Sequence, residues 1–343
     1  MFATVTLARW LGPWADATKA PRVAVADEHL DELRVRIYGD RTRHRAAYLV
    51  APGLHYAGPD DPRMDRFCRI LAAAGHVVIA PFIPSYLALV PDDAAKRDFA
   101  RVFDARARWT RRRPIVFSIS FGSLLAFALA AERGADIDRL VIFGGYRDLP
   151  ETLKFCLTGA VEGGRAATRD PLNQPVVLLN LLAHVRPAVS ADDRAAIAEA
   201  WRGYVRRTWG RMELKADRRF VAIAQELAPA VPPHLRELFL VGIGALPGAD
   251  TLAMDALTRF DGAALDPTPY LARIANRVDL VHGADDDVIP FEHSHALALR
   301  LTSTRARVHI TGMYGHTGAH APRLTAMAGE LATMLRVLRI LAA

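Results

Sequence analysis

The chain has 343 residues, 51% of them hydrophobic and 24% charged, so it can bury a substantial core and is neither a disordered nor a fibrous sequence. Its 2 cysteines are too few for a disulfide framework. No CxxC or Cys/His spacing indicates a metal site, and we expect no cofactor. The formal net charge is +7, but the 44 basic residues are almost all arginines scattered along the sequence, so we expect no nucleic-acid partner.

The beginning of the chain has none of the features of a secretory signal. Residues 1–20 lack a charged start, a long apolar stretch and a small-residue cleavage site. No apolar run approaches the ~20 residues that a membrane-spanning helix requires. We therefore expect a soluble, cytoplasmic protein without a transmembrane segment. The sequence does not indicate the oligomeric state.

Short apolar segments rich in valine and isoleucine recur along the chain, and helical stretches separate most of them. The apolar segments are too short for helices and lack polar alternation, which is typical of strands buried in a parallel sheet. Because parallel neighbours need a crossover, this alternation predicts an α/β fold with a doubly wound, mostly parallel sheet. The predicted strands are 33–38, 47–51, 77–81, 115–119, 140–143, 278–281 and 308–310, and the main helices between them are 62–74, 94–109, 123–133 and 291–301.

The alternation of strands and helices stops between about Gly145 and Ala275. That stretch has mainly helical periodicity, punctuated by Pro and Gly. We predict a core formed by residues 1–145 and 275–343, with a helical lid or cap (146–274) inserted between the strands that end near Phe143 and begin near Val278. A separate helical domain without contact to any site is the less favoured alternative, because the chain returns to complete the sheet. Helices are predicted at 176–185, 191–208, 218–227 and 233–243.

Ser120 lies where the predicted strand 115–119 runs directly into a helix, with Ser118 two residues before it and Gly122 two residues after. A serine in the pattern G-x-S-x-G projects from a strained turn as a nucleophile, and small flanking residues let the helix pack closely against the strand. This chain has S-x-S-x-G, so Ser118 stands where glycine is usual and could crowd the turn. The alternatives are that Ser120 only caps the helix, or that Ser118 or Ser123 is the nucleophile.

A serine nucleophile needs a base, and the base needs an orienting carboxylate. We predict that the carboxylate is Asp286, which follows the strand ending at Gly283. Asp285 and Asp287 are alternatives, although adjacent carboxylates of this kind are usually solvated loop or capping residues. We predict that the base is His316, in a glycine-rich loop after the last strand. His309, inside that strand, and His320, at a helix start, are weaker candidates.

The order Ser120, Asp286, His316, each after a separate strand, resembles that of the α/β-hydrolase family. The resemblance covers roughly residues 33–145 and 265–340, and it is to lid-bearing esterases, lipases and peptidases. Two segments are particularly similar, namely G-x-x-D-x-x-I-P from Gly283 to Pro290 and the preceding Pro269-Tyr-Leu-Ala-Arg-Ile.

Acyl transfer also requires N–H donors for the oxyanion. One donor is expected at Phe121, directly after the nucleophile. The resemblance implies that the second donor is Leu54, since Pro52-Gly53 stands where the family commonly has His-Gly. His55 and Tyr56 either line the pocket mouth or pack as a turn against the lid. The following apolar loop, residues 82–91, could form a pocket wall or pack under the lid.

The expected function is hydrolysis of a carboxylic ester, with a hydrophobic acyl group, by a Ser-His-Asp mechanism without cofactor. Thioesters, amides, lactones and C–C bonds remain open as substrates, whereas halide or epoxide chemistry would require Asp at position 120. A catalytically silent, hydrolase-like protein that binds a ligand or partner is a different class of function. Binding of DNA or RNA through the arginines is a third alternative, and it predicts a steep salt dependence.

Overall fold

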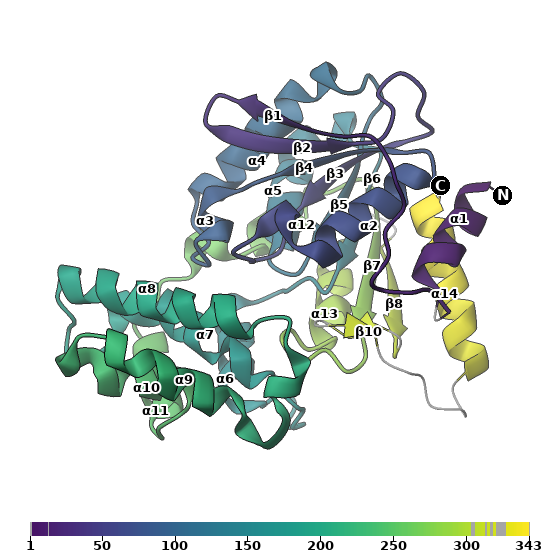
Figure 1. Cartoon of the computed structure of the whole chain (residues 1–343). Helices are drawn as coiled ribbons and strands as arrows, with labels where there is room; N and C mark the ends of the chain where they lie inside the picture. The colour runs from purple at the N-terminus through teal and green to yellow at the C-terminus, as the bar shows by residue number, and fades with distance from the viewer. Residues whose placement is uncertain are drawn as a thin grey trace.

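The structure, a computed structural model, describes residues 2–12, 14–302, 306–312, 314–315, 318–319 and 327–342. Its main sheet has eight strands in the order β1-β2-β4-β3-β5-β6-β7-β8 (Figure 1). The neighbours from β4 to β8 pair in parallel, whereas β1 and β2 form an antiparallel hairpin and β2 pairs antiparallel with β4. The predicted fold class, a doubly wound and mostly parallel sheet of the α/β-hydrolase type, is confirmed. The strands are β1 (Val25–Leu30), β2 (Leu33–Tyr38), β3 (Ala47–Ala51), β4 (Val77–Pro81), β5 (Ile115–Ile119), β6 (Arg139–Phe143), β7 (Arg277–Gly283) and β8 (Ala306–Thr311).

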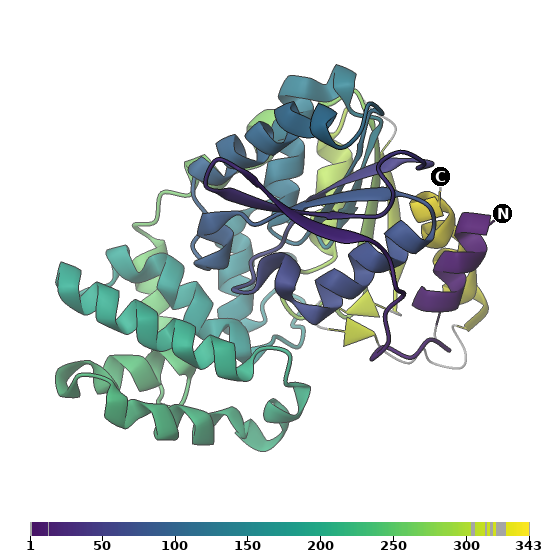
Figure 2. The ribbon, with the colours of Figure 1, turned by 45° about the horizontal axis from the view of Figure 1, so that its top comes forward.

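Helices cover both faces of the sheet, and each face has its own hydrophobic cluster. On one face, Leu7, Cys68 and Val337 belong to a cluster shared by α1 (Phe2–Leu11), α2 (Pro62–Ala73) and α14 (Met327–Ala342), with α1 lying beside α14 (Figures 1 and 2). On the other face, Phe99 and Leu125 belong to a cluster that includes α4 (Ala94–Asp104), α5 (Gly122–Arg133) and α13 (Glu292–Arg300). A short helix, α3 (Pro84–Leu87), follows β4, and β9 (Tyr314–Gly315) pairs with β10 (Gly318–Ala319) apart from the main sheet.

Between β6 and β7, residues 144–276 contribute helices and no strand of the main sheet. Most of these helices lie together beyond one edge of the sheet, as Figures 1 and 2 show, whereas residues 268–271 pack against α5 and α13. Trp201 and Phe239 of this segment belong to the same hydrophobic cluster as Phe99 and Leu125 of the core. The helical insertion therefore packs directly against the rest of the molecule. Its helices are α6 (Leu149–Thr158), α7 (Gln174–Leu181), α8 (Ala191–Thr208), α9 (Phe220–Leu227), α10 (Arg236–Ile243), α11 (Ala249–Leu257) and α12 (Thr268–Leu271).

His293 lies at a contact between the insertion and α13. Its side chain is buried, and its Nδ1 accepts a hydrogen bond of 3.0 Å from the backbone N–H of Arg147. Burial, together with the electrostatic effects of His282 and Arg147 and against the opposing effect of Asp286, lowers the pKa of His293 to about 3. The imidazole is therefore neutral in the folded protein at neutral pH.

We expect the free energy of unfolding to fall as the pH is lowered from about 6.5 toward about 4. In the unfolded chain His293 binds a proton near its ordinary pKa of about 6.5, whereas the folded chain does not, so acid favours unfolding. Chemical denaturation of the wild type and of His293→Gln across this range measures the effect, because glutamine does not titrate. The same pH dependence in both proteins would contradict this account of His293.

Candidate active site

Ser120 occupies a sharp turn between β5 and α5. Its φ of +54° lies in the left-handed region, which a residue with a side chain adopts at a cost of about 1–2 kcal/mol. Its backbone N–H donates to the carbonyl oxygen of Phe143 at 2.8 Å, which attaches the turn to the end of β6. The predicted strand-to-helix turn at Ser120 is therefore present, with Ser118 in the place of glycine.

The turn is tight because α5 begins directly against the loop that follows β3. A Cβ on Gly122 would lie 2.5 Å from the carbonyl oxygen of Pro52 and closer still to that of Ala51. From the other side, a Cβ on Gly53 would lie 3.3 Å from the carbonyl oxygen of Ile119 and 3.4 Å from the Cβ of Ser120. Glycine at both positions therefore lets the backbone of the β3 loop approach the nucleophile closely.

The three serines near this turn have different surroundings. Residue Phe121, not Ser120, is the N-cap of α5, and no side chain caps this helix. Ser123 accepts the backbone N–H of Tyr146 on its Oγ at 3.3 Å, which gives it a structural contact. Ser118 is fully buried in β5, and within the described residues its Oγ has no hydrogen-bond partner. These contacts leave Ser120 as the best candidate nucleophile.

Leu54 and Phe121, the predicted oxyanion donors, line the same cavity as Ser120. Among the backbone hydrogen bonds of the described residues, neither of their N–H groups donates to a carbonyl oxygen. The buried hydroxyl of Tyr86, in α3, donates to the carbonyl oxygen of Phe121 at 3.0 Å. This bond connects α3 to the first turn of α5.

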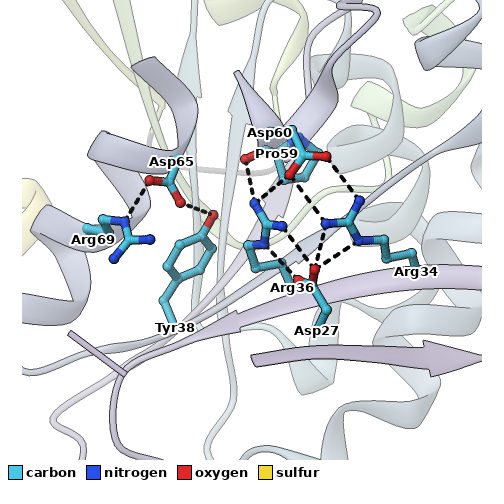
Figure 3. A network of polar contacts seen from close by, with 8 residues as sticks. All are labelled: Asp27, Arg34, Arg36, Tyr38, Pro59, Asp60, Asp65 and Arg69. Carbon is cyan, nitrogen blue, oxygen red and sulfur yellow. Dashed lines mark hydrogen bonds and ion pairs between the residues drawn. The ribbon is translucent and has the colours of Figure 1, made fainter. Parts of the chain in front are cut away.

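The loop after β3 is also anchored at its far end, at Asp60 in a short 3-10 turn (Gly58–Asp60). Arg34 and Arg36, which project from β2, each reach Asp60, with contacts of 3.0 and 2.7 Å, and both also reach Asp27 of β1 (Figure 3). Hydrogen bonding from Arg36, together with Arg34 and against partial burial, lowers the pKa of Asp27 to about 2. The charged cluster therefore ties the β1–β2 hairpin to the loop that carries Leu54.

The same face of β2 also holds the helix that follows this loop. The hydroxyl of Tyr38 donates to Asp65 of α2 at 3.0 Å, and Arg69 donates to the other carboxylate oxygen at 2.6 Å (Figure 3). Asp61 caps α2 by accepting the N–H groups of Arg63 and Met64. The helix predicted at 62–74 begins directly after this cap.

Asp286, the predicted orienting carboxylate, is buried and lines the cavity that contains Ser120. Its Oδ1 accepts the backbone N–H groups of Val288 at 2.9 Å and Ile289 at 2.7 Å. Its Oδ2 lies 3.4 Å from Nε2 of the buried His282. Bonds from two N–H donors favour the ionised form of a carboxylate and fix its orientation. The structure therefore brings the predicted acid and the predicted nucleophile to one cavity.

The two alternative carboxylates of this loop differ from each other. Asp285 is exposed, as expected for a solvated loop residue. Asp287 is half-buried and contacts Lys215 of the insertion at 2.8 Å, so the expectation of a solvated side chain is wrong there. Lys215 contacts the buried Asp170 at the same distance, and the N–H of Asp170 donates to the carbonyl oxygen of Asp287 at 2.9 Å. The insertion thus contacts Asp287, the residue next to the predicted acid, through both a side chain and the backbone.

Burial shifts the charges of this cluster in a consistent way. Burial would lower the pKa of Lys215, but the two carboxylates outweigh it and raise that pKa above its ordinary value. Burial, with repulsion from Asp287, raises the pKa of Asp170 in spite of Lys215. Lys215 is therefore charged and pairs with both neighbouring carboxylates. Sequence patterns did not single out Lys215 or Asp170, because the two are distant from each other and from Asp287 along the chain.

The predicted base, His316, lies outside the described residues, as does the alternative His320. His309 lies in β8, where its Nε2 is 3.4 Å from Oδ1 of the buried Asp279, and it does not line the cavity. His309, the alternative to His316 that the structure describes, therefore pairs with Asp279 and does not contribute to the candidate site.

The cavity has a volume of about 560 Å³ and is lined by the carboxyl ends of the strands and by the insertion. It extends along the face of the sheet that α1, α2 and α14 cover, where Leu11, Phe67 and Leu341 line it. His55 lines it, with its ring stacked on Tyr56 at 4.5 Å and 5.5 Å from the ring of Trp209 at the end of α8. Burial, with the charge of Arg63 and against that of Asp61, lowers the pKa of His55. Of the two predicted pocket residues, His55 therefore lines the cavity and Tyr56 packs behind it.

Most of the remaining cavity wall is apolar, and the insertion contributes a large share of it. Trp209 donates its Nε1–H to the carbonyl oxygen of Leu172 at 3.1 Å, which connects two segments of the insertion at the wall. The loop at residues 82–91 contributes Pro91 and receives hydrogen bonds from Asn180 and Arg202 on its carbonyl oxygens, so it packs under the insertion. The apolar residues that line the cavity from the insertion are Leu149, Leu153, Leu172, Val176, Val177, Trp209 and Met212.

Within the described residues, no group of three or more His, Cys, Asp or Glu side chains is placed to hold a metal ion. In the same part of the chain, no helix has the length and apolar character needed to cross a membrane. Both cysteines are buried, and Cys156 contacts the carbonyl oxygen of Val288 in the acid loop through its Sγ at 3.3 Å.

No family model matches the chain, and no curated protein matches it. Among solved structures, an acylaminoacyl peptidase from Pyrococcus horikoshii is 9% identical, with 94% of this chain and 41% of the peptidase covered and a TM-score of 0.49. The 2-hydroxy-6-oxo-6-phenylhexa-2,4-dienoate hydrolase of Rhodococcus sp. strain RHA1 is 16% identical, with 92% of this chain and 100% of the hydrolase covered and a TM-score of 0.46. A monoacylglycerol lipase from Paleococcus ferrophilus is 17% identical (91% and 99% covered, TM-score 0.45). The chain thus spans about two fifths of the length of the Pyrococcus peptidase, and the similarities concern the fold alone.

We expect Gly122→Ala to lower the free energy of unfolding by about 1–3 kcal/mol, because its Cβ would overlap backbone oxygens that cannot move aside. Gly203→Ala in α8 is the matched control, since a Cβ there meets only the end of Arg206, at 3.9 Å. That control should leave stability unchanged or raise it by about 0.5–1 kcal/mol. Urea denaturation of both variants measures the difference, and equal effects would contradict the close packing at Gly122.

We expect Lys215→Met to destabilise the protein by about 1–3 kcal/mol, because it leaves Asp170 and Asp287 as uncompensated neighbours at a partly solvated site. Lys154→Met, which removes an exposed lysine of the same insertion, should change stability by less than about 0.5 kcal/mol. Thermal and chemical denaturation of the two variants measure this contrast. A Lys215→Met protein as stable as the control would show that the cluster does not hold the acid loop.

Proposed function

We propose that this chain is a serine hydrolase that cleaves a carboxylic ester with a hydrophobic acyl group through an acyl-enzyme on Ser120. The observation that carries the proposal is the left-handed turn at Ser120, which faces the same cavity as Asp286 and the backbone of Leu54 and Phe121. A strained serine between a buried strand and a helix is the arrangement in which a hydroxyl is presented for nucleophilic attack.

The reaction then proceeds in two half-reactions. The Oγ of Ser120 attacks the ester carbonyl while His316 accepts its proton, and the N–H groups of Leu54 and Phe121 stabilise the oxyanion. The proton passes from His316 to the departing alkoxide as the tetrahedral intermediate collapses to the acyl-enzyme. In the second half-reaction, water attacks the acyl-enzyme while His316 accepts its proton, and the proton then returns to the Oγ of Ser120 as the carboxylic acid is released. Asp286, held by two backbone N–H donors, orients the imidazole and stabilises its charged form.

The apolar wall of the cavity supports a hydrophobic acyl group as the substrate portion. Leu149, Val176 and Val177 come from the insertion, which acts as a lid over the site in this proposal. A volume of about 560 Å³ is in the range of small-molecule pockets, which runs from about 300 to 1,000 Å³. Burial of each additional methylene of an acyl chain contributes about 0.8 kcal/mol, so the affinity should rise with chain length until the cavity is filled.

We expect wild-type protein to hydrolyse p-nitrophenyl esters and Ser120→Ala to lose at least about 10³-fold in kcat. Asp286→Asn should lose about 10²–10⁴-fold, because the imidazole is no longer held in the productive tautomer. Ser118→Ala is the matched control and should keep its activity, since its hydroxyl is buried in β5. Initial rates over an acyl series from acetate to octanoate measure these effects.

Equal rates for Ser120→Ala and the wild type would reject Ser120 as the nucleophile. Loss of activity in Ser118→Ala but not in Ser120→Ala would transfer the role to Ser118. Absence of turnover on every ester, with correctly folded protein, would instead favour the binding-protein class.

A further inference from the structure

The edge of the sheet opposite the candidate active site is formed by the loops that enter the parallel strands. Because β3, β5, β6, β7 and β8 run in parallel, all of these loops lie at the amino-terminal edge, whereas Ser120 and Asp286 follow the carboxyl ends of β5 and β7. The strand registers align the starts of these strands from Tyr48 in β3 to Ala306 in β8.

Hydrogen bonds join neighbouring entry loops into one surface. His44, before β3, contacts Oγ1 of Thr110, before β5, at 2.9 Å. The N–H of Asp138, before β6, donates to the carbonyl oxygen of Pro114 at 3.0 Å. The side chain of Asn276, before β7, donates to two carbonyl oxygens of the loop that precedes β6. The loops therefore lie side by side, although they are far apart in sequence.

Exposed arginines gather on this surface. Six of them form no ion pair with a carboxylate within the described residues, unlike most of the other arginines there. We call them the arginine edge, and they are Arg43 and Arg45 before β3, Arg111 and Arg112 before β5, and Arg300 and Arg307 at the entry to β8.

The carboxylates of the same loops are already engaged. Asp136 pairs with Arg106 at 3.2 Å, and Asp138 pairs with Arg139 at 2.7 Å. Asp40 uses its carboxylate to accept the N–H groups of the Thr42 turn. Hydrogen bonds from Thr42, together with the charge of Arg43, lower the pKa of Asp40, so its negative charge lies close to Arg43. The arginine edge therefore presents an excess of positive charge over the neighbouring acidic groups.

The chemistry and length of the edge indicate a ligand with repeated phosphates. Guanidinium groups match phosphate oxygens in a fork geometry. The four strand spacings from β3 to β8 cover about 19 Å at ~4.8 Å each, which is longer than one phosphate and close to six base pairs of duplex DNA. Some exposed apolar side chains also lie near this edge, because α1 begins with Phe2 and Val5 beside the end of α14, which contacts Tyr48 at the start of β3 (Figure 1). Binding to an anionic membrane is therefore the competing outcome that the test includes. One large apolar side chain, Leu299, lies beside Arg300.

We propose that the arginine edge binds the phosphate backbone of nucleic acid without reading its sequence. The expectation of no nucleic-acid partner rested on the scatter of the arginines along the chain, and folding brings six of them to one edge. This binding surface is independent of the proposed ester hydrolysis, which takes place at the other end of the strands.

The test is a fluorescence-anisotropy titration of a labelled 20-base-pair duplex of mixed sequence, at NaCl concentrations from 50 to 200 mM. We expect a Kd between about 10⁻⁶ and 10⁻⁴ M, and a slope of log K against log salt of about −5 for six phosphate contacts. Replacement of Arg45, Arg111 and Arg112 by Gln should raise the Kd at least about tenfold and reduce the slope by about 3.

The matched control replaces Arg206, Arg211 and Arg219 by Gln, which removes the same charge from exposed positions of the insertion. This control should keep the wild-type Kd and slope. Equal losses in both triple variants would reduce the effect to net charge and overturn the proposal, as would the absence of binding by wild type. Stronger binding to phosphatidylglycerol vesicles than to the duplex would assign the edge to a membrane surface. The melting temperature of each variant verifies that it is folded.

Discussion

The close packing of Gly122 against the carbonyl oxygens of Ala51 and Pro52 is the constraint on which the rest of the site depends. It brings the start of α5 against the loop after β3, and the chain enters α5 through the left-handed backbone of Ser120. The same contact sets Leu54 and Phe121 on the wall that Ser120 faces. Nucleophile and candidate oxyanion donors are thus positioned by one backbone-to-backbone contact.

Two charged clusters hold the two sides of this site. Arg34 and Arg36 tie the β1–β2 hairpin to Asp60, at the end of the loop that carries Leu54 (Figure 3). On the other side, Lys215 of the insertion bridges to Asp287, next to Asp286. The helical insertion is therefore coupled to the acid loop as well as to the cavity wall. In both clusters a loop is held by partners that lie far away in the sequence.

Features set by local sequence were predictable. The strands 33–38, 47–51, 77–81 and 115–119 have the predicted bounds, because runs of buried valine, isoleucine and leucine end at clear breaks. Ser120 was found from its small neighbours and the strand before it. By contrast, β1 was missed because its sequence, VADEHL, is mostly polar and exposed at the edge of the sheet. The helix α6 was also missed, although its buried residues Leu149, Leu153, Cys156 and Leu157 recur at helical spacing.

Features set by strand order were not predictable. Arg45, Arg111 and Arg307 become neighbours along one edge only through the order β3-β5-β6-β7-β8, which no single segment encodes. The partnership of Lys215 with Asp287 likewise depends on how the insertion folds back over the sheet. Clusters of this kind arise from the topology, and the sequence pattern alone shows only their members.

The most direct test of the central claim is to treat the protein with a fluorophosphonate and to locate the modified residue by peptide mass spectrometry. The account predicts one phosphonylated residue, Ser120, with Ser118 and Ser123 unmodified. Modification at another serine, or no modification of folded protein, would contradict it.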